Sequence, residues 1–142
     1  MRIFLSGIIQ GSRHGKNIHI QDYRSLLKDM LCRYAPAAEV VCPIDLHPNS
    51  VDYDEAQARQ TFDELVRLAS QADVVVAYLP EASMGTAIEI WEAHQRRVPV
   101  YTISPLAENW VVKLASTRVF ATVADFETFL GSGGLSAAEQ RT

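Results

Sequence analysis

Short apolar segments alternate with longer segments of helical periodicity along almost the whole chain. Residues 2–6 and 73–79 are the clearest strands, because each is a nearly continuous apolar run bounded by turn residues. The β-branched run at 74–76 is typical of a parallel strand that is covered on both faces. Three more short strands are predicted at 39–42, 98–103 and 118–121.

Helices are predicted between these strands from apolar residues spaced three and four apart. The first is expected over about 18–35, before Pro36, and the second begins after a capping Asp54 and runs to about Ser70. Their apolar sides consist of Ile20, Tyr23, Leu26, Leu27, Met30, Leu31 and Tyr34 in the first helix, and Ala58, Phe62, Leu65, Leu68 and Ala69 in the second. Shorter helices are expected near 85–96, 109–115 and 125–130.

This alternation predicts an α/β fold, a doubly wound, five-stranded parallel sheet with helices on both faces. The 142 residues fit a single domain, which we place at residues 1–130. Residues 131–142 are rich in glycine and contain almost no apolar residue beyond Leu135, so we expect a disordered tail.

Composition narrows the class of protein. A net charge of -4 argues against binding to a nucleic acid polymer, which requires a basic surface. No apolar run approaches the roughly 20 residues that span a bilayer, so no membrane association is expected. Cys32 and Cys42 are too few for a disulfide framework and no leader precedes the first strand, so we expect a cytoplasmic protein.

Ligands of open parallel sheets bind beyond the carboxyl ends of the strands, which here lead into segments 6–16, 79–89 and 104–110. The first of these contains Gly7, Gly11 and Gly15 but lacks the spacing of a P-loop or of a dinucleotide fingerprint. Two interpretations stay open for it, a loop that holds an anionic group and a solvated turn.

The second segment brings Ser83, Gly85 and Thr86 to a predicted helix N-terminus, where backbone N–H groups and the helix dipole favour an anion. Glu89 follows one turn later between apolar residues. That position suits a nucleophile or an acid–base group, although a solvated glutamate like Glu92 is the alternative.

Asp63 and Glu64, on the preceding predicted helix, are further carboxylate candidates, although helix carboxylates are usually solvated surface groups. The four histidines form no recognised metal-binding spacing with one another or with a cysteine. Metal and thiol chemistry are therefore not expected.

Two motifs carry a resemblance to a known family. The strand Ala72–Ala77, followed by Gly85-x-x-x-Glu89-x-x-x-Ala93 and then Pro99–Tyr101, resembles the nucleoside 2-deoxyribosyltransferase family. The opening segment Phe4–Arg13 is similar to the first strand and loop of that family, and the likeness extends in element order over most of residues 2–130. It is nearest to the branch that hydrolyses nucleoside 5′-monophosphates, and it implies a flavodoxin-like (Rossmann-like) fold.

The resemblance also implies roles for individual residues. The family's central glutamate, matched by Glu89, attacks the anomeric carbon of the sugar and expels the base, as in a retaining glycosidase. Water or a second base then releases the sugar. The matches to the phosphate-binding residues are Ser83 and Gly85, with further candidates in the first strand and loop at Ser6, Gly7, Gly11, Ser12 and Arg13.

Two of the family's functional residues have no direct counterpart in this sequence that the resemblance alone assigns. The family's assisting aspartate falls at Leu65, so Glu64, one residue away, is favoured over Asp63, two residues away. Asn109 resembles the residue that a neighbouring subunit donates to each pocket, although a helix N-cap is an equal alternative. A homodimer or higher homo-oligomer with shared active sites is therefore expected.

The function favoured by these residues is hydrolysis of the N-glycosidic bond of a (deoxy)nucleoside 5′-monophosphate, without a metal or an organic cofactor. A transferase that exchanges bases on the same site is a close alternative. A non-catalytic nucleotide-binding or signalling module is an alternative of another class, and so is a partner domain that assembles through Trp91 and Trp110.

Overall fold

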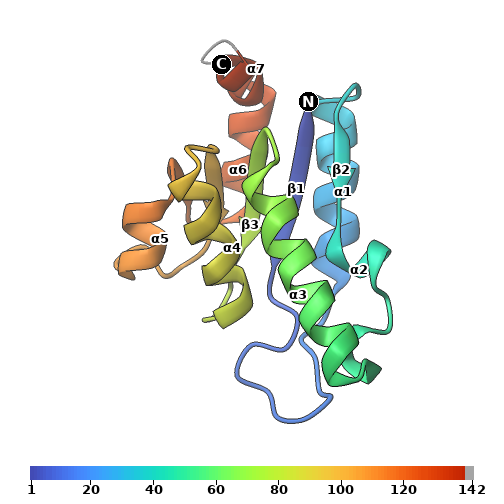
Figure 1. Ribbon diagram of the computed structural model, residues 1–142. Helices are drawn as coiled ribbons and strands as arrows, with labels where there is room; N and C mark the ends of the chain where they lie inside the picture. Colours follow the sequence, from blue (N-terminus) through green and yellow to red (C-terminus); the bar gives the residue numbers. More distant parts are fainter. Residues whose placement is uncertain (140–142) are drawn as a thin grey trace.

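Five parallel strands form one sheet in the order β2-β1-β3-β4-β5, as the alternation of elements predicts (Figure 1). This is the flavodoxin-like doubly wound order. The computed structural model describes residues 1–139. The strands are β1 (Arg2–Gly7), β2 (Glu39–Val41), β3 (Val74–Tyr78), β4 (Val100–Ile103) and β5 (Arg118–Phe120).

Helices cover both faces of the sheet. One face is covered by α1 (Asp22–Tyr34) and α6 (Val123–Gly131), and the other by α3 (Glu55–Ser70), α4 (Met84–Gln95) and α5 (Trp110–Ala115). Helices α3 and α4 lie in front of the sheet in Figure 1. The short elements α2 (Pro43–Leu46), η1 (Ser50–Asp52) and α7 (Gly134–Glu139) complete the chain.

The alternation of side chains along β1 decides which layer each residue meets. Ile3 and Leu5 are fully buried in the apolar core beneath α1 and α6. Phe4, between them, is fully buried in the second core, beneath α3, α4 and α5. Ser6 has the same parity as Phe4, so its side chain points toward the layer that contains α4.

The first helix starts later than its apolar pattern predicts. Residues 18–21 continue the loop, because the side chain of Gln21 donates to the carbonyl oxygen of Ile8 and the backbone of His19 donates to that of Ile9. Ile20 is consequently 68% exposed rather than buried. On α3, Phe62 also lies outside the core, half-exposed.

The expectation of disorder from residue 131 is wrong for the described part of this segment. Gly131 completes α6, and Gly134–Glu139 form α7, so the domain extends beyond residue 130. The physical reason is Leu135, the one large apolar side chain of the segment, which is buried in the core beneath α1 and α6. Residues 140–142 lie outside the described residues.

No helix within residues 1–139 combines the length and the apolar character that crossing a membrane would require.

Candidate active site

A cleft of about 200 Å³ opens at the carboxyl end of the sheet, between the end of β1 and the start of α4. Strand order reverses between β1 and β3, and such switch points are where open α/β sheets bind ligands. The long loop that follows β1 is at the bottom of Figure 1. The lining residues are Gly7, Ile9, Gln10, Gly11, Pro43, Ser83, Met84, Gly85, Thr86 and Glu89.

The first turn of α4 forms one wall of this cleft. Ser83 is the N-cap, and its hydroxyl oxygen accepts a 3.4 Å hydrogen bond from the backbone N–H of Thr86. Gly85 leaves the backbone open, since a Cβ there would meet no protein atom within 4 Å. Because the first N–H groups of a helix have no intrahelical partner and carry its positive dipole end, this wall suits an anion.

Glu89 lines the same cleft, in the second turn of α4. The hydroxyl of Ser6 donates a hydrogen bond to its Oε2 atom, joining α4 to β1. Burial raises the pKa of the Glu89 carboxyl from 4.5 to about 7, although the Ser6 hydrogen bond and the positive charge of Arg24 both lower it. A carboxyl with such a pKa changes its charge near neutrality, as nucleophiles and acid–base groups of active sites often do.

Two tyrosines stack near the carboxyl ends of β1 and β3, and one of them, Tyr23, interacts electrostatically with Glu89. Tyr23 of α1 stacks on Tyr78 at the end of β3, with 4.3 Å between ring centroids, and its hydroxyl donates to the carbonyl oxygen of Ile8. A Cβ at Gly7 would lie 2.5 Å from the Tyr23 hydroxyl, so only glycine allows this packing. The carboxyl end of β1 is therefore held against α1.

Only some of the residues predicted to bind phosphate in and before the glycine-rich loop line the cleft. Gly7 and Gly11 line the cleft, and Gly11 has a φ of 60°, a conformation that favours glycine. Ser12 and Arg13 are exposed and do not belong to the lining. Both would have to approach a bound ligand from the rim.

Glu64 and Asp63 lie outside the cleft lining. Glu64 Oε2 is 3.0 Å from His47 Nε2, and His47 Nδ1 is 3.0 Å from the hydroxyl of Tyr53. Asp63 lines a separate groove of about 490 Å³ between α3 and α4, together with Phe62, Val66, Arg67, Ser70, Gln71, Glu92 and Arg96.

Asn109 is the N-cap of α5, and its side chain accepts hydrogen bonds from the backbone N–H groups of Val111 and Val112 at 3.0 and 3.4 Å. The capping interpretation is therefore confirmed. Asn109 also lines an apolar pocket of about 150 Å³ that shares Ser83 and Met84 with the cleft, so it lies close to the Glu89 site of its own chain.

Arg24 is a component of the site that the sequence analysis does not predict, as are the lining residues Pro43 and Met84. Arg24 is 3% exposed and donates hydrogen bonds to the carbonyl oxygens of Leu5 and Gly7, on both sides of Ser6. A signal for it exists in the helical pattern, because Arg24 falls three residues before Leu27 and seven before Leu31, on the buried face of α1. A charged residue on such a face requires partners.

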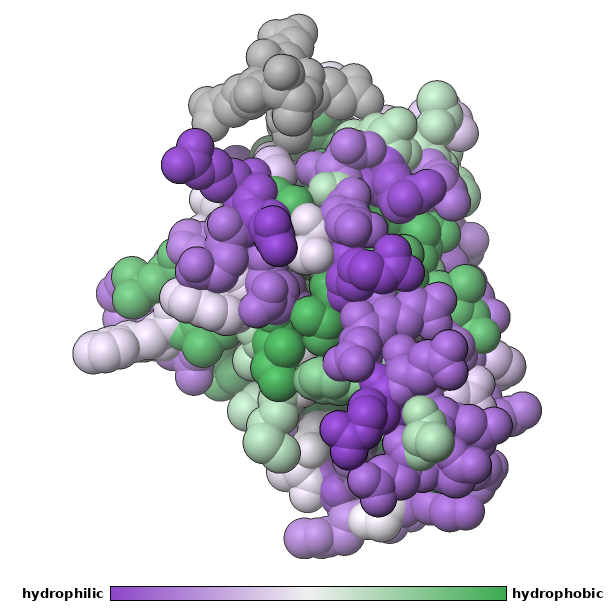
Figure 2. Space-filling view, viewed as in Figure 1, coloured by the Kyte–Doolittle hydropathy of each residue, from purple (hydrophilic) through white to green (hydrophobic). Residues whose placement is uncertain are grey.

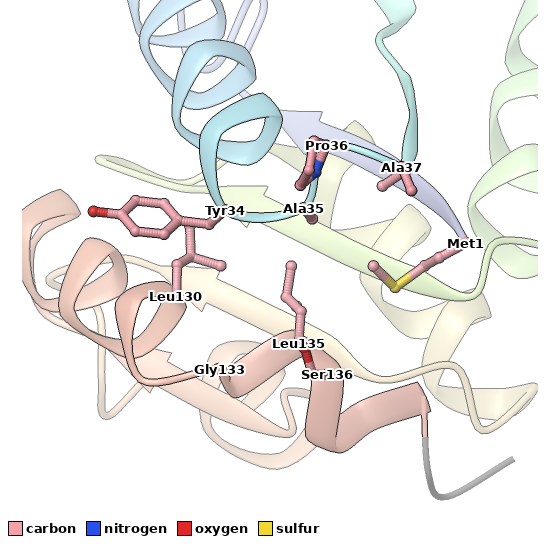
Figure 3. Close-up of a pocket in the computed structure, with 10 residues that line it drawn as sticks. Met1, Tyr34, Ala35, Pro36, Ala37, Leu130, Gly133, Leu135 and Ser136 are labelled. Atoms are coloured by element: carbon pink, nitrogen blue, oxygen red, sulfur yellow. The ribbon is translucent and has the colours of Figure 1, made fainter.

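A second cleft, of about 210 Å³, lies at the opposite end of the sheet and is bordered by Met1, Tyr34, Leu130 and Leu135 (Figure 3). Among the residues whose side chains the structure describes, no aspartate, glutamate, lysine, arginine or histidine lines it. Within residues 1–139, no three His, Cys, Asp or Glu side chains are grouped so that they could hold a metal ion.

Neither a family model nor a curated protein matches the chain. Solved structures do match it. A 2-deoxyribosyltransferase from Bacillus psychrosaccharolyticus superposes with a TM-score of 0.66 at 17% identity, over 89% of this chain and 90% of its own. A conserved protein from Enterococcus faecalis V583 superposes with a TM-score of 0.54 at 16% identity, over 99% and 98%. The chain therefore has the fold of a 2-deoxyribosyltransferase.

Proposed function

We propose that the chain cleaves the N-glycosidic bond of a nucleoside 5′-monophosphate, with Glu89 as the nucleophile. The observation that carries this proposal is the position of the Glu89 carboxyl, which is oriented by Ser6 in a cleft bounded by the N-terminus of α4. The fold that the chain shares with a 2-deoxyribosyltransferase supports the class of reaction.

The proposed reaction has two steps. A Glu89 carboxylate oxygen forms an ester bond to the anomeric carbon, while the electron pair of the N-glycosidic bond leaves with the base, which takes up a proton. A water oxygen then attacks the same carbon, the ester bond breaks, and the Glu89 carboxylate is restored. The net reaction consumes one water and yields free base and sugar 5-phosphate.

The 5′-phosphate is assigned to the first turn of α4. Ser83 and Gly85 line the cleft there, together with Gly7 at the end of β1 and Gly11 in the loop that follows. Ser6 holds the nucleophile. Ser12 and Arg13 lie on the exposed part of that loop, and we assign them to the outer side of the phosphate. The anion-binding properties of a helix N-terminus supply the physical reason.

We assign protonation of the leaving base to Glu64, in preference to Asp63. Glu64 is hydrogen-bonded to His47, four residues beyond the cleft-lining Pro43, whereas Asp63 faces the groove between α3 and α4. Glu64→Gln should then slow release of a poor leaving base far more than that of a good one. A larger loss in Asp63→Asn would reverse the assignment.

A second copy of the chain is proposed to complete the site. The cleft volume is below the roughly 300 Å³ at which ligand pockets begin. Next to it, α4 and α5 expose large apolar side chains, and Figure 2 shows green residues over these helices. They are Met84, Ile88, Trp91, Trp110, Val111 and Leu114. Such a surface suits an interface, and Asn109 at its edge is the residue that we expect to approach the partner's site.

Two other functions keep specific support. Base exchange is favoured by the fold neighbour, which is itself a transferase. Nucleotide binding without catalysis is favoured by Glu64, whose carboxylate contacts His47 instead of lining the cleft.

The test is a panel of nucleoside 5′-monophosphates and nucleosides, incubated with the protein and assayed for free base by chromatography. We expect release from the monophosphates, loss of release in Glu89→Gln, and normal release in Glu92→Gln, which alters a half-buried carboxylate on the same helix that lies outside the cleft lining. A new nucleoside on addition of a second base would establish the transferase. Nucleotide binding by calorimetry with no base release would establish the non-catalytic module.

A further inference from the structure

The carboxyl half of β1 has no strand partner on one side. Strand β2 pairs only with Arg2, Ile3 and Phe4, whereas β3 accompanies β1 as far as Gly7. Odd-numbered carbonyls face β2, as the hydrogen bond from Glu39 N–H to Met1 O shows. The carbonyl oxygens of Leu5 and Gly7 therefore point to an edge that β2 does not reach.

Arg24 occupies this edge in place of a strand. Its two terminal nitrogens donate to Leu5 O at 3.2 Å and to Gly7 O at 3.0 Å, and its Nε donates to Gln21 Oε1 at 2.8 Å. One terminal nitrogen also lies 3.7 Å from the sulfur of Cys42, at the end of β2. The guanidinium thus joins the start of α1 to β1 and to the residue before the cleft-lining Pro43.

The free energy needed to bury the Arg24 guanidinium suggests that this arginine has a function in the site. Burying a cation is unfavourable unless its charge is compensated, and within residues 1–139 Arg24 forms no ion pair with a carboxylate. Its compensation comes from carbonyl oxygens and from the charge of Glu89, whose pKa the arginine lowers. The two carbonyls that Arg24 binds flank Ser6, the residue that contacts Glu89.

We propose that Arg24 is a positioning residue, which fixes the backbone on both sides of Ser6 and so directs the Ser6 hydroxyl at Glu89. This inference rests on the proposed function of Glu89. Arginine suits the task because its planar fork binds two acceptors at once, whereas a lysine ammonium acts as a single flexible point charge. Arg24→Lys should keep the charge and lose the two-point contact.

Other titratable groups interact electrostatically with Tyr23, which itself interacts with Glu89. Tyr23 comes from α1, Tyr78 from the end of β3, and Cys42 from the end of β2, and the charge of Glu89 contributes to raising the pKa of Tyr23. The variants therefore change Arg24 and leave these groups in place.

The first measurement is steady-state base release by Arg24→Lys and Arg24→Met. Arg33→Met is the matched control, because Arg33 is exposed on the same helix. We expect kcat to fall by up to about tenfold in Arg24→Lys, the loss that removal of the Ser6 hydroxyl would cause, and at least as much in Arg24→Met, with little change in KM, since misplacing a catalytic group is costly. In a Ser6→Ala background, Arg24→Lys should cause almost no further loss. Fully additive losses, or a wild-type kcat in Arg24→Lys, would overturn the inference.

The second measurement does not depend on turnover. Carbon-13 NMR of glutamate-labelled protein follows the Glu89 carboxyl, assigned by its absence in Glu89→Gln. We expect the titration midpoint to move upward in both Arg24 variants, by about one unit or more in Arg24→Met. An unchanged midpoint in both, even with lowered thermal stability, would show a merely structural arginine. A wild-type chain that releases no base would instead refute the proposed function, while the NMR titration would still decide whether Arg24 acts on Glu89.

Discussion

The hydroxyl of Ser6 and the Oε2 atom of Glu89 form a hydrogen bond across 83 positions of the sequence, and this contact connects the central strand to the helix that lines the cleft. The hydroxyl supplies a hydrogen-bond donor to the carboxylate but no positive charge, and it favours the ionised form. Burial and this hydrogen bond act in opposite directions on the Glu89 pKa, and burial is the larger effect.

The pH dependence of base release should report Glu89. A nucleophilic carboxyl must be ionised, and burial raises its pKa to about 7, so kcat/KM should rise with pH through a midpoint near 7. The measurement is kcat/KM for a nucleoside monophosphate between pH 5 and 9. An acidic limb centred near pH 4.5 would show that burial does not govern this group.

Removing the Ser6 hydroxyl should shift the midpoint of this pH dependence to a higher pH. Its hydrogen bond stabilises the charged carboxylate, so Ser6→Ala should raise the apparent pKa above 7 and lower kcat at pH 7 by about tenfold. Thr102→Ala serves as a control, since Thr102 is a buried hydroxyl of β4 that contacts Ser116. An unchanged midpoint in Ser6→Ala would mean that the contact does not tune the nucleophile.

Stability should also depend on the ionisation of Glu89. Its pKa is higher in the folded chain than the ordinary value of 4.5, so the folded state binds more protons between pH 4.5 and 7 and the free energy of unfolding falls as pH rises through that window. The loss is about 3 kcal/mol at most, because each pKa unit corresponds to about 1.4 kcal/mol. Urea unfolding at pH 5 and pH 8 should therefore show a smaller decrease for Glu89→Gln than for the wild type. Parallel behaviour of the two proteins would contradict the coupling.

Gly85→Ala should separate folding from phosphate binding. A Cβ at this position meets no protein atom within 4 Å, and alanine is the better helix former, so stability should increase by up to about 1 kcal/mol. The new methyl group occupies the cleft wall, so KM for a nucleoside monophosphate should rise while KM for the free nucleoside changes little. Equal changes for both substrates would remove Gly85 from the phosphate site.

We expect the exposed apolar surface of α4 and α5 to be buried at the interface of a homo-oligomer. Trp110 is 79% exposed and Leu114 65% exposed, so Trp110→Asp and Leu114→Asp should yield monomers with strongly reduced base release. Leu26→Asp, on α1, alters an exposed leucine on the other layer and should change neither property. Size-exclusion chromatography coupled to light scattering measures the oligomeric state of each variant. A wild-type chain that is monomeric and fully active would refute the shared site.

Most of the fold was accessible from the sequence because its signals are local. The β-branched run Val74–Val76 marks the central strand, and Ser83 marks the start of α4, six residues before Glu89. The start of α1 was mispredicted because Gln21 binds the β1 loop instead of extending the helix. The order in α7 was missed because a single leucine, Leu135, is enough to anchor it.

The site was accessible only in part, because its remaining contacts join distant segments. The partner of Glu89 is Ser6 and the partner of Glu64 is His47, and neither pairing leaves a periodic pattern. Arg24 is the exception, since a charge on the buried face of α1 is visible in the sequence once that face is identified.

A covalent bond between Glu89 and the sugar can be detected by mass spectrometry of the protein quenched in acid during turnover of a nucleoside 5′-monophosphate. We expect a fraction of the protein to gain the mass of one sugar phosphate residue, attached to the peptide that contains Glu89, and no such species in Glu89→Gln. Base release that continues in Glu89→Gln, or an adduct on another residue, would contradict the role of Glu89 as nucleophile.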